Sequence, residues 1–115
     1  KEFVKLGDLT KEVDKIMEAM HQDLFTASEE LQKKESVTVK TFAQLKKAIA
    51  DRKLVWGDWC GDESCEERIT SETPSKVLCL PFVDNDCNKG TIKAKGDCCV
   101  CGKKAEHVAL IARSY

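Results

Sequence analysis

No apolar run in the sequence approaches the length of roughly 20 residues that is needed to cross a bilayer. No apolar stretch near Lys1 resembles a signal peptide. Neither a membrane protein nor a secreted one is indicated. An excess of one charge is also absent, because 19 Lys and Arg residues stand against 20 Asp and Glu residues, for a net charge of −1. A uniformly basic face for nucleic acid and an acidic solvating tail are therefore both excluded.

Catalytic motifs and internal repeats are absent as well. The chain has no phosphate-binding G-x-x-x-x-G-K-[ST] loop, no nucleophile elbow and no H-E-x-x-H pattern, so it is not expected to catalyse a reaction by itself. Its 115 residues suffice for one domain, or for one domain with an appended element. With 42% hydrophobic and 34% charged residues, the chain is predicted to fold. Because it opens on Lys and a charged mixture, we expect a segment of a longer protein.

The pattern of apolar residues predicts an α+β fold in which a long amphipathic helix precedes a small mixed sheet. Apolar residues from Leu9 to Leu31 recur mostly every three or four positions, which is typical of a helix with one apolar face. Thr41 and Gln44 have the spacing of a helix-capping box. Strands are expected over residues 36–39, 54–56, 76–80 and 107–112, with short helices after Thr41 and over 66–72, and a loop over 83–97.

Seven cysteines, at positions 60, 65, 79, 87, 98, 99 and 101, are the most unusual feature of so short a chain. Cys60 and Cys65 form a C-x4-C turn, and Cys98 and Cys101 form a C-x2-C turn. Each turn can place two thiolates about 2.3 Å from one ion, so the two pairs fit a single tetrahedral zinc. A glycine follows Cys60 and another follows Cys101, which relaxes the backbone where each turn doubles back.

Other uses of these cysteines are weaker hypotheses. Disulfides are disfavoured by the odd number of cysteines and by the missing secretory signal, and solitary reduced thiols by the paired spacing. A catalytic zinc needs an open coordination position, whereas four thiolates close the coordination sphere. The sequence therefore favours a structural zinc.

The fourth ligand is left open by the doublet at 98 and 99. Cys98 gives the commoner C-x2-C turn and is preferred narrowly, but Cys99 is sterically possible. His107 is a less favoured substitute and is expected to pack at the sheet edge. Cys79, inside an apolar strand, is expected to be a buried packing residue, and Cys87 is expected to be a spare thiol in a polar loop.

The charges around the two turns are opposite. Residues 89–104 contain five lysines and one aspartate, whereas residues 60–72 contain five acidic residues and one arginine. Attraction between these segments would help the two pairs of cysteines to meet. Trp56 and Trp59, just before the first turn, are expected to cover a small metal-nucleated core.

Several motifs stand in a specific order: Cys60-Gly-Asp-Glu-Ser-Cys65-Glu-Glu, Val77-Leu-Cys-Leu-Pro-Phe82, Cys101-Gly-Lys103 and Ala112-Arg-Ser-Tyr115. With these motifs the chain resembles the carboxy-terminal region of prolyl-tRNA synthetases of the archaeal and eukaryotic type. The upstream segment Asp23-Leu-Phe-Thr-Ala-Ser-Glu-Glu-Leu31 resembles the helix that, in this family, leads from the anticodon-binding domain into a zinc-binding terminal module.

This resemblance implies that residues 1–35 are a linker helix from an upstream anticodon-binding domain and that residues 36–115 are a C-terminal zinc-binding domain. It implies a structural zinc on Cys60, Cys65 and Cys101, with the fourth ligand open as above. Family members end in a tyrosine whose carboxylate reaches toward the active-site region, so Tyr115 is expected to make a functional contact.

The resemblance also implies what the longer protein does. It would be a cytoplasmic, homodimeric ligase that activates proline with ATP and Mg²⁺ and transfers it to tRNA-Pro. The catalytic and anticodon-binding domains would lie upstream, and the present segment alone would not be catalytic.

Two rival functions remain open at this point. A free-standing zinc module would bind nucleic acid through its lysines, which are Lys89, Lys93, Lys95, Lys103 and Lys104. A thiol redox protein would use Cys98, Cys99 and Cys101, and it would need a thiol of low pKa and metal-free activity.

Overall fold

The computed structural model describes residues 3–115, which form two compact units. The first unit extends to Lys34, and the second is Glu35–Tyr115. Residues 1 and 2 of the predicted 1–35 segment lie outside the described part of the chain.

The first unit consists mainly of helix α1 (Leu9–Glu35), which follows a short 3-10 turn, η1 (Leu6–Asp8). The helix expected over residues 9–31 is confirmed and continues to Glu35. No residue of α1 is buried, so its apolar stripe is exposed. Across residues 3–115, no helix has the length and apolar character needed to cross a membrane.

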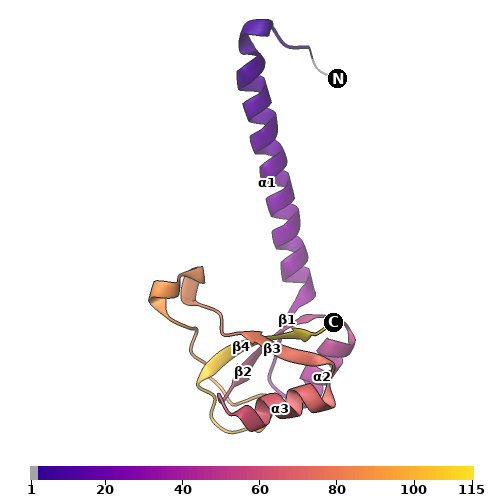
Figure 1. The fold of residues 1–115 in the computed structure, drawn as a ribbon, viewed down its shortest axis with the longest axis vertical. Helices are drawn as coiled ribbons and strands as arrows, with labels where there is room; N and C mark the ends of the chain where they lie inside the picture. The colour runs from indigo at the N-terminus through magenta and orange to yellow at the C-terminus, as the bar shows by residue number, and fades with distance from the viewer. Residues whose placement is uncertain (1–2) are drawn as a thin grey trace. The chain divides into compact units, whose positions relative to one another are not determined.

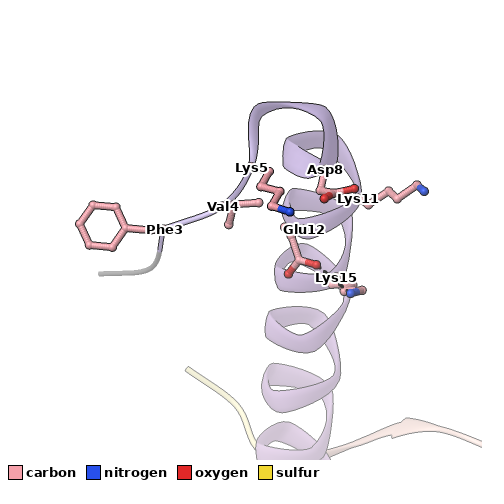
Figure 2. Close-up of a pocket in the computed structure, with 7 residues that line it drawn as sticks. All are labelled: Phe3, Val4, Lys5, Asp8, Lys11, Glu12 and Lys15. Carbon is pink, nitrogen blue, oxygen red and sulfur yellow. Dashed lines mark hydrogen bonds and ion pairs between the residues drawn. The ribbon is translucent and has the colours of Figure 1, made fainter.

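A hollow beside the start of α1 is lined mainly by charged side chains between Lys5 and Lys15 (Figure 2). Glu12 and Lys15 form an ion pair of 2.8 Å there, and the ring of Phe3 points away from the helix. Lysines and carboxylates are interspersed along this lining, so the hollow has no strong field of one sign. It is therefore not a candidate site.

The second unit alternates strands and helices and ends in a returning strand (Figure 1). Its elements are β1 (Ser36–Val39), α2 (Phe42–Ala50), β2 (Leu54–Trp59), α3 (Glu63–Glu72), β3 (Ser75–Cys79), the 3-10 turns η2 (Val83–Asn85) and η3 (Cys87–Lys89), and β4 (His107–Arg113). Every helix and strand expected from the sequence is present, so the α+β fold is confirmed. Helix α3 begins at Glu63, ahead of the expected residue 66, because Asp62 caps it.

The four strands form one mixed sheet in the order β1-β2-β4-β3. Strands β1 and β2 are parallel, and β4 runs antiparallel to both of its neighbours. The connection between the parallel strands passes through α2, which begins at the expected cap: the Thr41 hydroxyl accepts the Gln44 N–H at 3.3 Å.

The two faces of the sheet have different surroundings. Val55 on β2 and Ile111 on β4 are completely buried and share one core with residues of both α2 and α3. Successive residues of a strand point to opposite faces, so the cross-strand pair Trp56 and Leu110 lies on the other face. These two residues are only half-buried. Both helices therefore cover the same face.

The expected burial of Cys79 is wrong, because this residue is exposed. Cys79 is the last residue of β3, which is an edge strand, and the pairing register shifts between Val77 and Cys79. The shift pairs Cys79 with Leu110, on the face opposite the helices. An apolar neighbourhood in the sequence therefore did not ensure burial at this irregular strand end.

The expected loop over residues 83–97 is confirmed as a segment with little regular structure. It folds back along the chain through isolated bridges that join Phe82 to Thr91, Lys93 to His107 and Asp97 to Lys104. The bridges return the chain to β2, where Cys99 N–H donates to the Asp58 carbonyl at 2.9 Å. This excursion delivers the second cysteine turn beside the first.

Candidate metal centre

The first cysteine turn joins the end of β2 to the start of α3. Gly61 follows Cys60 with a φ of +83°, a conformation that favours glycine. The Asp62 N–H then donates to the Cys60 sulfur, and the Asp62 carboxylate accepts the Ser64 N–H at 2.9 Å. Asp62 thus caps the helix whose first turn contains the buried Cys65.

The second turn is built in the same way. The Cys98 N–H donates to the Lys103 carbonyl at 2.7 Å, and the Gly102 N–H donates to the Cys98 carbonyl at 2.9 Å. Gly102 has a φ of +74°, and the Lys103 N–H donates to the Cys101 sulfur. Both turns therefore have a cysteine, a glycine at positive φ, and an amide that points at the cysteine sulfur.

Four sulfurs meet between these turns, those of Cys60, Cys65, Cys98 and Cys101, all within 4.8 Å of one another. The Cys60 sulfur lies 3.6 Å from that of Cys65 and 3.8 Å from that of Cys101. A tetrahedral zinc with Zn–S bonds of about 2.3 Å separates its sulfurs by about 3.8 Å, whereas a disulfide requires about 2.05 Å. All seven cysteines are free. The donor set thus fits zinc.

Three of the cluster thiols, those of Cys60, Cys65 and Cys101, have shifted pKa values. Burial is the main cause that raises the pKa of Cys60 and also that of Cys65. The Lys103 amide has the opposite effect and lowers the pKa of Cys101 to about 7. Without a cation the thiols of Cys60 and Cys65 keep their protons, and a divalent ion that binds thiolates would displace them.

Cys99 lies apart from the four sulfurs and packs against strand β2. A β-carbon placed on Gly57 would lie only 3.0 Å from the Cys99 sulfur, so a glycine is needed there for the close approach. Burial raises the pKa of Cys99 to about 12. The structure therefore brings Cys98, and not Cys99, to the cluster.

Sequence reasoning missed the roles of Gly57 and Asp58 in seating the second turn. Asp58 accepts the Cys99 N–H through its carbonyl and the Gly96 N–H through its carboxylate, at 2.9 and 3.1 Å. A glycine at an inward-facing strand position was the available indication of a close contact.

The remaining candidates lie outside the cluster. His107 is partly buried and lies opposite Trp59 in the sheet, on a central strand and not at the expected edge. Trp59 packs against the core as expected, whereas Trp56 lies on the other face. Cys87 is exposed in η3. Tyr115 is 95% exposed, with the Arg113 guanidinium 5.7 Å from its ring centre.

One pair of opposite charges, Lys103 and Asp62, links the two turns electrostatically, without an ion pair between them among the described residues. The charge of Lys103, in the second turn, is among the causes that lower the pKa of Asp62, in the first. Among the loop lysines, Lys89 forms an ion pair with Asp84 at 2.8 Å. Two of these lysines, Lys89 and Lys103, thus have an acidic neighbour within the module.

Comparisons with known proteins agree with one another. A family model described as "Prolyl-tRNA synthetase, C-terminal" matches residues 42–115. The chain is 29% identical to a proline–tRNA ligase of Alkaliphilus oremlandii and 30% identical to one of Thermococcus kodakarensis, covering 100% and 97% of this chain but 23% of each relative. A crystal structure of prolyl-tRNA synthetase from Cryptosporidium parvum with L-proline and AMP superposes with a TM-score of 0.78 and 30% identity, over 97% of this chain and 23% of that one. The chain thus spans just under a quarter of the length of these relatives.

Replacing Asp62 tests how the first turn is built. We expect Asp62→Ala to lower the melting temperature more than Asp62→Asn, because asparagine keeps an acceptor for the Ser64 amide. That hydrogen bond is the main cause that lowers the pKa of Asp62 below its ordinary value of 3.8. Its contribution is therefore present above about pH 4 and is lost as the pH falls through the lowered pKa.

Melting curves followed by circular dichroism at pH 7 with excess zinc provide the measurement. Asp23→Ala, at an exposed position of α1, is the control and should leave the transition of the second unit in place. Equal melting temperatures for Asp62→Ala and the unaltered chain would contradict the capping role.

Proposed function

The chain belongs to the family of prolyl-tRNA synthetase C-terminal domains, and we propose that it is the C-terminal structural module of a ligase that attaches proline to tRNA-Pro. ATP and Mg²⁺ would be used only by the catalytic domain upstream. The observation that supports a structural role is the closed set of four sulfurs at zinc spacing. A closed set leaves no position for substrate or water on the ion.

Zinc in this site would be held by Cys60, Cys65, Cys98 and Cys101. When bound, it would have a structural role. It would join the end of β2 and the start of α3 to the second cysteine turn, which lies in the 80–106 excursion, the segment between β3 and β4. The exposed fraction of Cys98 is 2% and that of Cys65 is 5%, so part of the site is shielded from solvent. Such sites contribute folding free energy on the order of 10 kcal/mol.

The rival functions have less support. The relatives are more than four times as long as this chain, which argues against a free-standing nucleic-acid module. A redox role for the doublet conflicts with the burial of Cys99 and its raised pKa of about 12. Cys101 has a lowered pKa, but its sulfur belongs to the four-sulfur cluster.

Metal analysis of two serine variants tests the ligand set. Native mass spectrometry should find one zinc per chain, retained in Cys99→Ser and lost in Cys98→Ser, because only the Cys98 sulfur lies in the cluster. Chelation of the unaltered chain should lower its melting temperature and change its circular dichroism.

The two variants are matched controls for each other, since both replace a buried thiol in one turn. Zinc lost only from Cys99→Ser would move the fourth ligand to Cys99. A chain purified without zinc and unable to take it up would refute the structural-zinc proposal.

The partner we propose for this module is the upstream part of the same polypeptide. Two surfaces support this: the exposed apolar stripe of α1, and the sheet face opposite the helices, where Trp56 and Leu110 are only half-buried. We propose that α1 is the linker helix from the anticodon-binding domain and that the sheet face packs on the upstream domains. The enzyme would act as a cytoplasmic homodimer, and tRNA-Pro would be bound through the whole enzyme.

A lysine on the sheet face tests this packing. In the full-length enzyme, Trp56→Lys should weaken the contact between the module and the remaining domains, because burying a charge at that contact costs free energy. The module and the remaining domains should then unfold in separate calorimetric transitions. Ala50→Lys, at an exposed position at the end of α2, is the control and should leave the transitions coupled. Unfolding of Trp56→Lys that matches the unaltered enzyme would rule out this surface as the contact.

Tyr115 is proposed to contact the active-site region of the enzyme, in keeping with its 95% exposure in the module. In the full-length enzyme we expect deletion of Tyr115 to slow aminoacylation without lowering the melting temperature, because the residue is exposed and contributes little to the core. Lys76→Ala, at another exposed position, serves as the control. An unchanged rate of aminoacylation would argue against the contact.

A further inference from the structure

Arg68, in the middle of α3, contacts three separate parts of the second unit. Its Nη1 donates to the Val100 carbonyl at 3.3 Å, and its Nε donates to the Glu72 carboxylate at 2.8 Å. The guanidinium also lies 4.6 Å from the ring centre of Phe42, at the start of α2. Lys46 approaches the same carboxylate and the same ring, so the two cations share two neighbours.

The contact with Val100 connects the two halves of the cysteine cluster. Val100 is buried and lies in the second turn, immediately before Cys101. Arg68 and Cys65 are three residues apart on α3, so their side chains lie on one face of the helix. The helix that supplies one sulfur therefore also anchors the backbone of the turn that supplies two others.

The connection matters because local secondary structure does not fix the second turn. The turn ends an excursion whose hydrogen bonds are mostly isolated bridges and short 3-10 turns. Its position beside β2 depends on long-range contacts such as those of Asp58. Arg68 adds such a contact from the other side, through α3.

We infer that Arg68 is a positioning residue for the metal centre: its guanidinium fixes the second cysteine turn against α3, so that both pairs of sulfurs stay at metal-binding distance. The inference rests on the proposed zinc site. Arg68 touches neither the ion nor a ligand side chain, and it acts through the backbone of Val100.

The geometry requires arginine. One guanidinium donates from Nη1 to Val100 and from Nε to Glu72, while its central carbon lies over the Phe42 ring. A lysine has one ammonium group and cannot make these contacts together. The Arg68 side chain is 50% exposed, so its charge alone has a small effect on stability, and its effect on the metal should come from geometry.

The test measures zinc release to an excess of a coloured chelator from the whole 115-residue chain. We expect Arg68→Gln and Arg68→Lys each to release zinc roughly tenfold faster than the unaltered chain, at the low end of effects seen for groups that orient metal ligands. The matched control is Lys46→Gln, which removes a cation from the same carboxylate and the same ring but leaves the Val100 bond in place. It should release zinc at the unaltered rate.

The outcomes separate this inference from the proposed function. Release at the unaltered rate from both Arg68 variants overturns the positioning role while zinc binding stands. Equal acceleration in Lys46→Gln, or an unaltered rate in Arg68→Lys alone, also overturns it, because general packing or charge would then explain the effect. An unaltered chain that holds no zinc refutes the zinc proposal itself. Circular dichroism of each zinc-loaded variant before chelation shows whether it is folded at the start of the measurement.

Discussion

Four cysteine sulfurs within 4.8 Å of one another form an arrangement that a protein cannot easily maintain without a cation. Four thiolates would repel one another, and four neighbouring thiols are weak hydrogen-bonding partners. Disulfides would need the sulfurs to approach by well over an ångström from the observed 3.6 and 3.8 Å. One divalent ion would satisfy all four groups and would hold the segment 80–106, between β3 and β4, in place. The rest of the second unit can then be understood as a small core joined to a metal-fixed loop.

The core stabilises the sheet and its two helices, whereas the metal centre would stabilise the excursion outside the sheet. A single layer of two helices on one sheet face buries residues such as Leu45 and Ile69. This core does little to fix the position of a long excursion outside the sheet. Small domains of this kind commonly depend on a metal for much of their folding free energy. The excursion is tied to β2 through Asp58 and to α3 through Arg68, and its second turn supplies two sulfurs of the cluster, those of Cys98 and Cys101.

The sequence was sufficient where the relevant interactions are local. The cap formed by Thr41 and Gln44, the strand positions and the paired cysteine turns all follow from residues within a few positions of each other. It was insufficient where contacts between residues far apart in the sequence determine the position of a side chain. Cys98 and Cys99 differ because Gly57, 42 positions before Cys99, leaves room for one sulfur against β2. The exposure of Cys79 depends on a register shift against β4, and no pattern around either residue encodes these contacts.

A metal that fixed one end of the unit would also affect how the opposite sheet face is used. A sheet with helices on one face only is usually completed by a second layer. If zinc and the one-sided core already make the unit rigid, the face around Trp56 and Leu110 is not needed for folding and is free to take its second layer from other domains of the same polypeptide. Rigidity matters for such packing because a preformed surface loses less conformational entropy on contact than a flexible one. Under the proposed function, the ion would let the module fold independently, and the sheet face around Trp56 and Leu110 would remain for contact with the other domains.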